Sequence, residues 1–222
     1  DSLSDDFDAV FLSIGLGGVN ALGVNDDQAL PAVDFIEDLR QSEDLTKLAV
    51  GRRVVVIGGG MTAIDVGTQA LLLGAQDVTI AYRRGRDNMN ASSAEQDQSS
   101  AKGVNIRHWM QPVEVTKSGS GSLNVKMEFT TLSEGKLTGT GKFETVEVDQ
   151  LFTAIGQTLA AGEAIASIAV EHGRIRVDET FRTSNPSVWA GGDCVAGGDD
   201  LTVTAVAQGR DAAEAIHAAL VT

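Results

Sequence analysis

The stretch that decides the fold is RVVVIGGGMTA, residues 53–63. Its first five residues are a short, mostly apolar run without helical periodicity, which is typical of a strand buried on both faces. Three glycines follow at once, and the pattern Gly-x-Gly-x-x-(Gly/Ala) fits this segment. Between a strand and a helix, the pattern predicts a loop that binds the pyrophosphate of a dinucleotide. The predicted binding residues are Gly58, Gly59, Gly60, Met61, Thr62 and Ala63.

The residues after the glycines complete a strand–helix–strand unit. From residue 62 to residue 73 apolar side chains recur near helical spacing, and Gly74 follows as a natural C-cap. Residues 77–82 form a second strand, and the crossover is long enough for parallel pairing. The helix N-terminus offers N–H groups to an anion. The alternative is a glycine turn between packed elements that binds no ligand.

The second strand ends in Tyr82, Arg83 and Arg84. An acidic residue at this position would bind the ribose 2′-hydroxyl of NAD, whereas an arginine pairs with the 2′-phosphate of NADP. Two adjacent arginines in an acidic chain therefore predict NADP(H) as the cofactor, because a guanidinium matches phosphate oxygens with two hydrogen bonds. The alternative is a solvated basic turn, since Arg86 follows and surface arginines are common.

The flanking sequence predicts an α/β protein of the nucleotide-binding type, with a parallel sheet plus a β-meander. Alternating apolar and polar residues with glycine punctuation predict the antiparallel meander over residues 113–148. Pro31 can occupy the first turn of a helix over residues 31–40, and a polar stretch over residues 92–102 can hold another. The remaining predicted elements are strands at 8–15, 104–109, 149–155, 174–177 and 187–190, and an Ala-rich helix at 202–220.

Composition narrows the function. The chain has 222 residues with 42% hydrophobic residues, 22% charged residues and 25 glycines, as expected for a globular protein with many tight turns. A net charge of −14 makes nucleic acid and anionic membranes unfavourable partners. No apolar run approaches a membrane span, and the N-terminal residues do not resemble a signal peptide, so we expect a cytoplasmic protein. The first residue is not methionine, which hints at a piece of a longer chain.

Few other residues suggest chemistry. Gly191, Gly192 and Asp193 stand between a predicted strand and a helix, but Gly-Gly-Asp alone is a weak motif. The single cysteine, Cys194, cannot form an internal disulfide or a Cys-x-x-Cys pair, so redox chemistry requires a bound organic cofactor. We expect no metal site and interpret four further polar residues as structural: Asp65, His108, His172 and His217.

Taken together, five motifs resemble the FAD/NAD(P)-dependent pyridine nucleotide oxidoreductases. In chain order they are DAVFLSIG (8–15), VVVIGGGMTAID (54–65), YRR (82–84), AIGQ (154–157) and WAGGDC (189–194). They are most similar to the motifs of the small subunit of NADPH-dependent glutamate synthase and of the NAD(P)H-oxidising part of dihydropyrimidine dehydrogenase. The resemblance implies a Rossmann-like FAD/NAD(P)-binding fold of three layers. In it an NADP-binding domain, residues 21–156, is inserted into an FAD-binding domain of which residues 1–20 and 157–222 are the remnant.

The resemblance also implies roles for individual residues. Gly15 and Gly156 would close the two crossings between the domains, and Gly192 and Asp193 would meet the flavin. Gly156 and Thr202 are also expected among the cofactor-binding residues. The helix from Thr202 would point its N-terminus at the isoalloxazine. Hydride would pass from nicotinamide C4 to flavin N5 through ring stacking, so no catalytic side chain is expected.

Three departures from the family pattern stand out. Met61 occupies a position where Asn or Asp is common, and Met89-Asn90 replaces a frequent Met-Pro. The N-terminal fingerprint for the FAD pyrophosphate and the cysteine-rich iron–sulfur region that precedes it in the glutamate synthase group are missing. We therefore expect the 222-residue chain to bind FAD weakly or not at all, and to self-associate through exposed strands near Val10 and Val188.

The sequence thus predicts an NADPH-dependent oxidoreductase whose parent protein passes a hydride from NADPH to FAD and electrons onward to iron–sulfur centres or a large partner subunit. One alternative is a non-catalytic fragment that binds NADP without a flavin. Another is a disulfide reductase of the thioredoxin reductase kind, although the Cys-x-x-Cys pair is absent from this sequence.

Overall fold

The computed structural model describes residues 3–24, 27–119 and 121–221. The chain folds into two compact units. Unit 1 comprises residues 1–20 and 157–222, and unit 2 comprises residues 21–156. Among the described residues, no helix is both long and apolar enough to cross a membrane.

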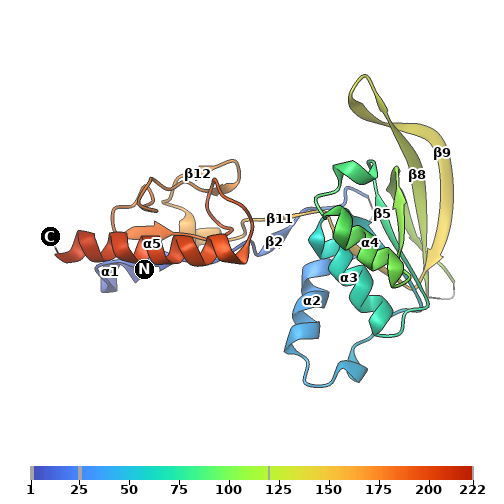
Figure 1. The fold of residues 1–222 in the computed structure, drawn as a ribbon, viewed down its shortest axis with the longest axis horizontal. Helices are drawn as coiled ribbons and strands as arrows, with labels where there is room; N and C mark the ends of the chain where they lie inside the picture. The colour runs from blue at the N-terminus through green and yellow to red at the C-terminus, as the bar shows by residue number, and fades with distance from the viewer. Residues whose placement is uncertain (1–2, 25–26, 120, 222) are drawn as a thin grey trace. The chain divides into compact units, whose positions relative to one another are not determined.

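Unit 2 is built around a five-stranded sheet in which every pairing is parallel. The strand order is β3-β10-β4-β5-β6. The bounds are β3 Leu30–Pro31, β4 Arg53–Gly58, β5 Asp77–Tyr82, β6 Asn105–His108 and β10 Gln150–Ala154. The α/β fold with a parallel sheet that the sequence predicts is confirmed (Figure 1).

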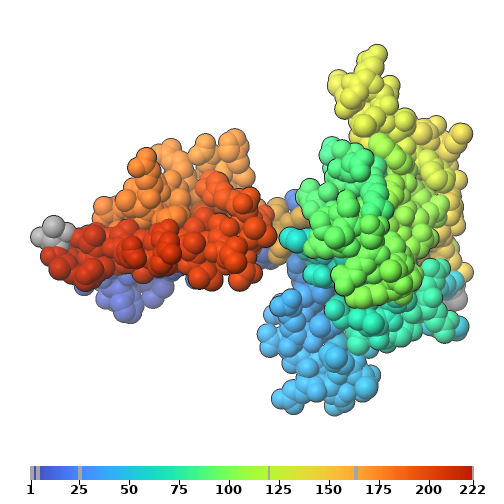
Figure 2. Space-filling view, in the orientation of Figure 1, coloured from blue at the N-terminus to red at the C-terminus, as the bar shows by residue number. Residues whose placement is uncertain are grey.

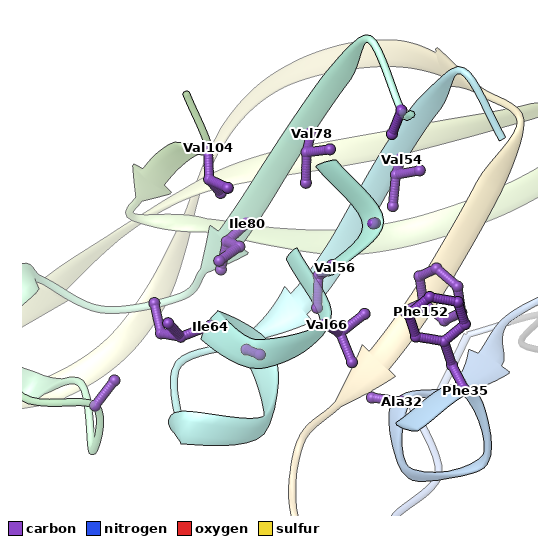
Figure 3. Close-up of a cluster of buried hydrophobic side chains, with 14 of the residues drawn as sticks. Ala32, Phe35, Val54, Val56, Ile64, Val66, Val78, Ile80, Val104 and Phe152 are labelled. Atoms are coloured by element: carbon purple, nitrogen blue, oxygen red, sulfur yellow. The ribbon is translucent and has the colours of Figure 1, made fainter. Parts of the chain in front are cut away.

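Both faces of this sheet are covered, and successive residues of β4 point to opposite faces. Val54 and Val56 belong to the cluster on the helical side, which includes Val66 and Phe152 (Figure 3). Val55 and Ile57 belong to a second cluster formed with the meander. A strand with apolar residues on both faces reads as a continuous hydrophobic run, which explains the sequence of β4.

Three helices cover one face: α2 Ala32–Gln41, α3 Met61–Leu72 and α4 Ser93–Ala101. In α2, Phe35 packs on Phe152 with ring centroids 4.9 Å apart. The prediction of Pro31 in the first helical turn is wrong by one residue, because Pro31 ends β3 and is the extended N-cap of α2.

The helix at residues 93–101 is polar, yet two local features stabilise it. The Ser92 hydroxyl accepts a hydrogen bond from the Glu95 backbone N–H, and the Glu95 carboxylate accepts one from the Ser92 N–H, which forms a capping box. The buried hydroxyls of Thr68 and Ser99 lie 3.0 Å apart and link α3 to α4. The polar stretch therefore folds as a helix through capping and this contact.

The predicted meander covers the other face of the sheet. It comprises β7 Met110–Lys117, β8 Leu123–Ser133 and β9 Lys136–Val148, paired antiparallel in that order. The hydrogen-bond register shifts between Pro112 and Glu114 and again between Glu128 and Thr130. The tip of the β8–β9 hairpin projects beyond the rest of unit 2 (Figure 2). Short 3₁₀ turns complete the unit at Leu45–Lys47 and Arg86–Asn88.

Unit 1 has smaller sheets. β1 Val10–Leu12 pairs in parallel with β14 Val188–Ala190, and β12 Val170–Glu171 pairs antiparallel with β13 Arg174–Ile175. β2 Gly18–Val19 pairs antiparallel with β11 Gln157–Thr158, so the two segments that lead to unit 2 run side by side. The helices are α1 Leu3–Asp6, the 3₁₀ turn Gly162–Ile165, and α5 Thr202–Val221.

Two expectations for unit 1 are corrected. The strand predicted at 8–15 is limited to Val10–Leu12 and is half-buried, because its partner β14 is only three residues long. Val188 is buried against Ile175 and Val195 in a small cluster, so β14 does not present an exposed apolar strand. The exposed apolar side chains of this unit include Val203 and Val206 on α5.

Candidate dinucleotide-binding site

The predicted binding loop lies at the carboxyl edge of the parallel sheet. Because all five strands run the same way, Gly58, Tyr82, His108 and Ala154 end neighbouring strands at this edge. From β4 the chain proceeds to β5 and β6 on one side, whereas β10 lies on the other. The β4–β10 boundary is therefore the point where strand order reverses, which is where ligands bind in open α/β sheets.

Gly58 and Gly59 are required by close packing. Gly58 has φ +154°, and a Cβ atom there would collide with the Ala154 carbonyl of the adjacent strand. A Cβ atom on Gly59 would collide with the Tyr82 ring. The Tyr82 hydroxyl donates a 2.6 Å hydrogen bond to the Asn88 carbonyl, which fixes the ring against the loop. These two glycines thus let the loop turn tightly over the sheet.

Gly60 differs because the space beside it is open. A Cβ atom on Gly60 would have no other atom within 4 Å. Gly60 is the N-cap of α3, and no side chain caps this helix. The Ala63 N–H donates to the Gly60 carbonyl at 3.1 Å, so among the described residues the N–H groups of Met61 and Thr62 remain available to an anion that approaches over Gly60. The geometry fits a pyrophosphate.

The next three residues of the pattern begin α3 in different environments. Met61 is exposed, Thr62 is half-buried, and Ala63 is fully buried. The small Ala63 side chain lets α3 pack closely on the sheet, as the third position of the pattern requires. Met61 and Thr62 lie in the first turn beside the open space at Gly60.

Arg83 and Arg84 follow β5 at the same edge. Both side chains are exposed, and among the residues that the structure describes neither guanidinium has a hydrogen-bond or ion-pair partner. Arg86, by contrast, forms a 2.7 Å ion pair with Asp97. Exposed guanidinium groups without a partner among the described residues fit an anion site and also the alternative of a solvated basic turn, so the choice for Arg83 and Arg84 stays a prediction.

β6 ends at His108, at this same edge of the sheet. The residues around His108 in the sequence do not indicate that its side chain is partly buried there. Its Nε2 atom is buried without a partner among the described residues. Burial lowers the pKa of His108 below its ordinary value, and the nearby Arg86 lowers it further. In the sheet His108 pairs with Tyr82 of β5.

Gly156 lies two residues after the end of β10 with φ +99°. The last residue of that strand, Ala154, pairs with Gly58, so the structure brings the predicted residue Gly156 to the same edge as the glycine loop. Gly15, the other predicted crossing residue, has φ +57°. Both glycines occupy the left-handed region that disfavours a side chain.

The residues predicted to meet a flavin lie in unit 1. Gly192 has φ +80°, and its N–H donates a 2.7 Å hydrogen bond to Gln208 Oε1 of α5. The Asp193 carbonyl accepts a 2.7 Å hydrogen bond from Arg174. Thr202 is the exposed first residue of α5. The structure thus brings Gly192 against α5, whose N-terminus is at Thr202.

In the described part of the chain, neither Cys194 nor a cluster of metal-ligating side chains marks a second site. The Cys194 thiol is buried and donates to the Gly191 carbonyl, with 3.2 Å between Sγ and the oxygen. Within the described ranges, no group of three or more His, Cys, Asp or Glu residues could hold a metal ion. A cavity of about 160 Å³ lies between the sheet and the meander, but its lining includes Arg53 and Asp77, which begin β4 and β5 at the opposite edge.

The chain is similar in sequence to two named proteins of Escherichia coli. The chain is 35% identical to the glutamate synthase [NADPH] small chain of Escherichia coli, a match that covers 97% of this chain and 51% of the relative. It is 31% identical to the NAD-dependent dihydropyrimidine dehydrogenase subunit PreT of the same species, covering 94% of this chain and 47% of the relative. The chain therefore spans about half the length of these curated relatives.

The fold is also that of a solved structure. Thioredoxin reductase of T. acidophilum matches with a TM-score of 0.76 and 21% identity, over 96% of this chain and 66% of the other. The family model described as pyridine nucleotide-disulphide oxidoreductase matches residues 1–209. The chain belongs to the pyridine nucleotide-disulphide oxidoreductase family.

Proposed function

We propose that unit 2 binds NADP(H), with the pyrophosphate at Gly58–Ala63 and the 2′-phosphate at Arg83 and Arg84. The observation that carries this proposal is the pair of unpartnered guanidinium groups, within the described residues, at the edge where Gly60 is open and α3 is uncapped. A loop that contacts only the pyrophosphate would not need them. The names of the two relatives do not decide between NADP(H) and NAD(H) for this chain, because one name contains NADPH and the other contains NAD.

In the whole protein, we propose that NADPH supplies a hydride and FAD accepts it. This chain's contribution to the flavin site would be Gly192, Asp193 and the start of α5. The fit is partial, because the N–H of Gly192 is already bonded to Gln208. The chain's own residues would orient the nucleotide and leave the chemistry to the cofactors, so no catalytic side chain is assigned.

We also propose that the electrons pass onward to iron–sulfur centres or to a partner subunit. The names of two relatives, a small chain and a subunit, support a multi-subunit context. The identity of the acceptor and the cytoplasmic location stay predictions.

The test is a calorimetric titration of the 222-residue chain with NADP⁺ and NAD⁺. NADP⁺ is expected to bind more tightly, because only its 2′-phosphate can accept hydrogen bonds from the two arginines. The double variant Arg83→Ala/Arg84→Ala should erase this preference, a loss of about 1.5–3 kcal/mol in NADP⁺ binding.

Arg52→Ala is the matched control. Arg52 is exposed, precedes the opposite end of β4, and donates hydrogen bonds to Gln76. The Arg52→Ala substitution changes the net charge at a distance from the predicted site, so the variant should still bind NADP⁺ more tightly than NAD⁺. Equal affinity of the unaltered chain for both nucleotides, or tighter binding of NAD⁺, would overturn the assignment.

A second function, NADP binding without flavin, is supported by a contrast between the units. In unit 2 the space beside Gly60 is open, whereas in unit 1 the Gly192 N–H is already bonded to Gln208. Visible absorbance of the purified chain separates the two functions. Stoichiometric flavin absorbance supports hydride transfer to FAD within this chain, whereas its absence, with NADP⁺ bound, supports the binding fragment. The disulfide reductase alternative lacks its cysteine pair in this sequence, where only Cys194 is present.

A further inference from the structure

The loop that carries Arg83 and Arg84 is held by hydrogen bonds from distant parts of unit 2. The Thr130 hydroxyl on β8 donates a 2.8 Å hydrogen bond to the Arg83 carbonyl. The Trp109 N–H donates to the Arg84 carbonyl at 3.2 Å, and the Thr130 N–H donates to the Trp109 carbonyl at 2.9 Å. A continuous path of three hydrogen bonds thus joins the meander to both arginine carbonyls.

Trp109 occupies an unusual backbone conformation within this path. Its φ of +62° lies in the left-handed region, which is rarely adopted by a bulky residue. Its side chain lies against Gly85, where an added Cβ atom would be 2.9 Å from Trp109 Cζ2. Such strain persists only where the surroundings determine the conformation. The strained residue lies directly beside the arginine loop.

The far end of the loop is fixed as well. The Asn88 carbonyl accepts the hydrogen bond from Tyr82, and Arg86 pairs with Asp97. The backbone is therefore held on both sides of the two arginines, while their guanidinium groups have no partner in the described part of the chain. Because its backbone carbonyls are held by hydrogen bonds and its two guanidinium groups are unpartnered among the described residues, this loop is preorganised to bind an anion.

We propose that Thr130 is a positioning residue for recognition of the 2′-phosphate. Its buried hydroxyl, on a residue only 5% exposed, fixes the Arg83 carbonyl and thereby directs the Arg83 and Arg84 side chains. The meander then takes part in nucleotide selectivity although it contributes no residue to the glycine loop. This inference rests on the proposed binding of NADP(H) at the arginine pair.

The experiment compares Thr130→Val, which removes the hydroxyl and keeps the shape, with Thr130→Ser, which keeps the hydroxyl. Dissociation constants for NADP⁺ and NAD⁺ are measured by calorimetry on the 222-residue chain. Thr130→Val should raise the NADP⁺ dissociation constant about fivefold, the usual effect of one lost hydrogen bond, and leave that of NAD⁺ within about twofold. Thr130→Ser should match the unaltered chain for both nucleotides.

Thr131→Val is the matched control, because it makes the same change at the exposed neighbouring residue of β8. It should leave both dissociation constants unchanged. If Thr130→Val does not fold, Thr130→Cys supplies a similar shape with a weak S–H donor, and the NADP⁺ dissociation constant should rise about two- to threefold.

The outcomes separate this inference from the proposed function. If the unaltered chain does not prefer NADP⁺, the proposed function fails and this inference with it. If the chain prefers NADP⁺ and the ratio of the two dissociation constants is unchanged in Thr130→Val or Thr130→Cys, the positioning role is overturned and the proposed function stands. Equal loss in Thr130→Val and Thr130→Ser also overturns it, because the hydroxyl would then not be the cause.

Discussion

The two units bury their helices to very different extents. In unit 2, α3 buries six of its twelve residues between the sheet and its neighbouring helices. In unit 1, α5 is longer, yet of its twenty described residues only Gln208 and Ala212 are buried. Burial of apolar surface is the main favourable term in folding, so unit 2 has the larger share of the chain's stability. The unit that carries the glycine loop is also the one with a core on both faces of its sheet.

The sharpest test of this contrast uses one phenylalanine from each unit. Phe152 is fully buried in unit 2, whereas Phe7 in unit 1 is 60% exposed. Phe152→Ala should lower the free energy of unfolding by about 3–5 kcal/mol, because it leaves a cavity beside Phe35. Phe7→Ala should change it by no more than about 0.5 kcal/mol. Urea denaturation followed by circular dichroism measures both, and similar losses would remove the distinction between the units.

A smaller effect is expected at the glycine loop of unit 2. Gly60→Val should leave the protein folded, since the space beside Gly60 is open, and should weaken NADP⁺ binding at least about tenfold by blocking the pyrophosphate. Gly58→Ala should instead destabilise the fold, by about 1–3 kcal/mol, because of its backbone conformation and the Ala154 carbonyl. Thermal denaturation and calorimetry distinguish the two. Unchanged NADP⁺ affinity in folded Gly60→Val would make the loop purely structural.

Each unit also has an ion pair that makes its stability depend on pH. Hydrogen bonds from Arg107 lower the pKa of the Glu144 carboxyl in unit 2, and those from Arg174 lower the pKa of Asp200 in unit 1. A carboxyl whose pKa is lower in the folded state stabilises that state above its unfolded pKa. This contribution is lost as the pH falls through the folded pKa.

Glu144→Gln should therefore cost about 0.5–1 kcal/mol at pH 7, within the range for solvent-accessible pairs, and the cost should shrink as the pH falls below the ordinary glutamate pKa and through the lowered one. Asp200→Asn should show the same trend with falling pH, beginning from the lower ordinary pKa of an aspartate. Hydrogen exchange resolved by residue should show the loss of stability in unit 2 for Glu144→Gln and in unit 1 for Asp200→Asn. A loss from Glu144→Gln that persists at low pH would point to packing instead of charge.

The smallest effect on stability is expected on the surface of α5. Val203 and Val206 are 72% and 69% exposed, so Val203→Ser/Val206→Ser should change the free energy of unfolding by less than about 0.5 kcal/mol. The same variant should reduce self-association of the chain, measured by sedimentation velocity. Identical sedimentation of the variant and the unaltered chain at matched concentrations would place any self-association elsewhere.

The sequence predicts unit 2 well because its signals are local. Continuous apolar runs mark the strands β4 and β10, and alternation marks the meander. The glycine loop and the arginines are likewise read from adjacent residues. The structure adds that Gly59 packs against Tyr82 and that, within the described ranges, Arg83 and Arg84 are unpartnered while Arg86 is paired.

What the sequence does not reveal depends on contacts between distant residues. Thr130 lies 47 residues from Arg83, and neither its type nor its neighbours indicate that its hydroxyl faces that carbonyl. The left-handed conformation of Trp109 cannot be predicted from the sequence either, because that conformation ordinarily favours glycine and not a tryptophan. The extent of β1 is set by the length of β14, which lies far along the chain.

The pairing of β2 with β11 has a consequence for how this architecture can change. Val19 pairs with Gln157, so the chain leaves unit 1 for unit 2 and returns to unit 1 at adjacent points. An insertion whose entry and exit meet disturbs the host no more than a surface loop would. We therefore expect that a short turn between Val19 and Gln157 can replace unit 2. We also expect that unit 2 can be inserted into another protein at a hairpin whose two strands have a similar spacing.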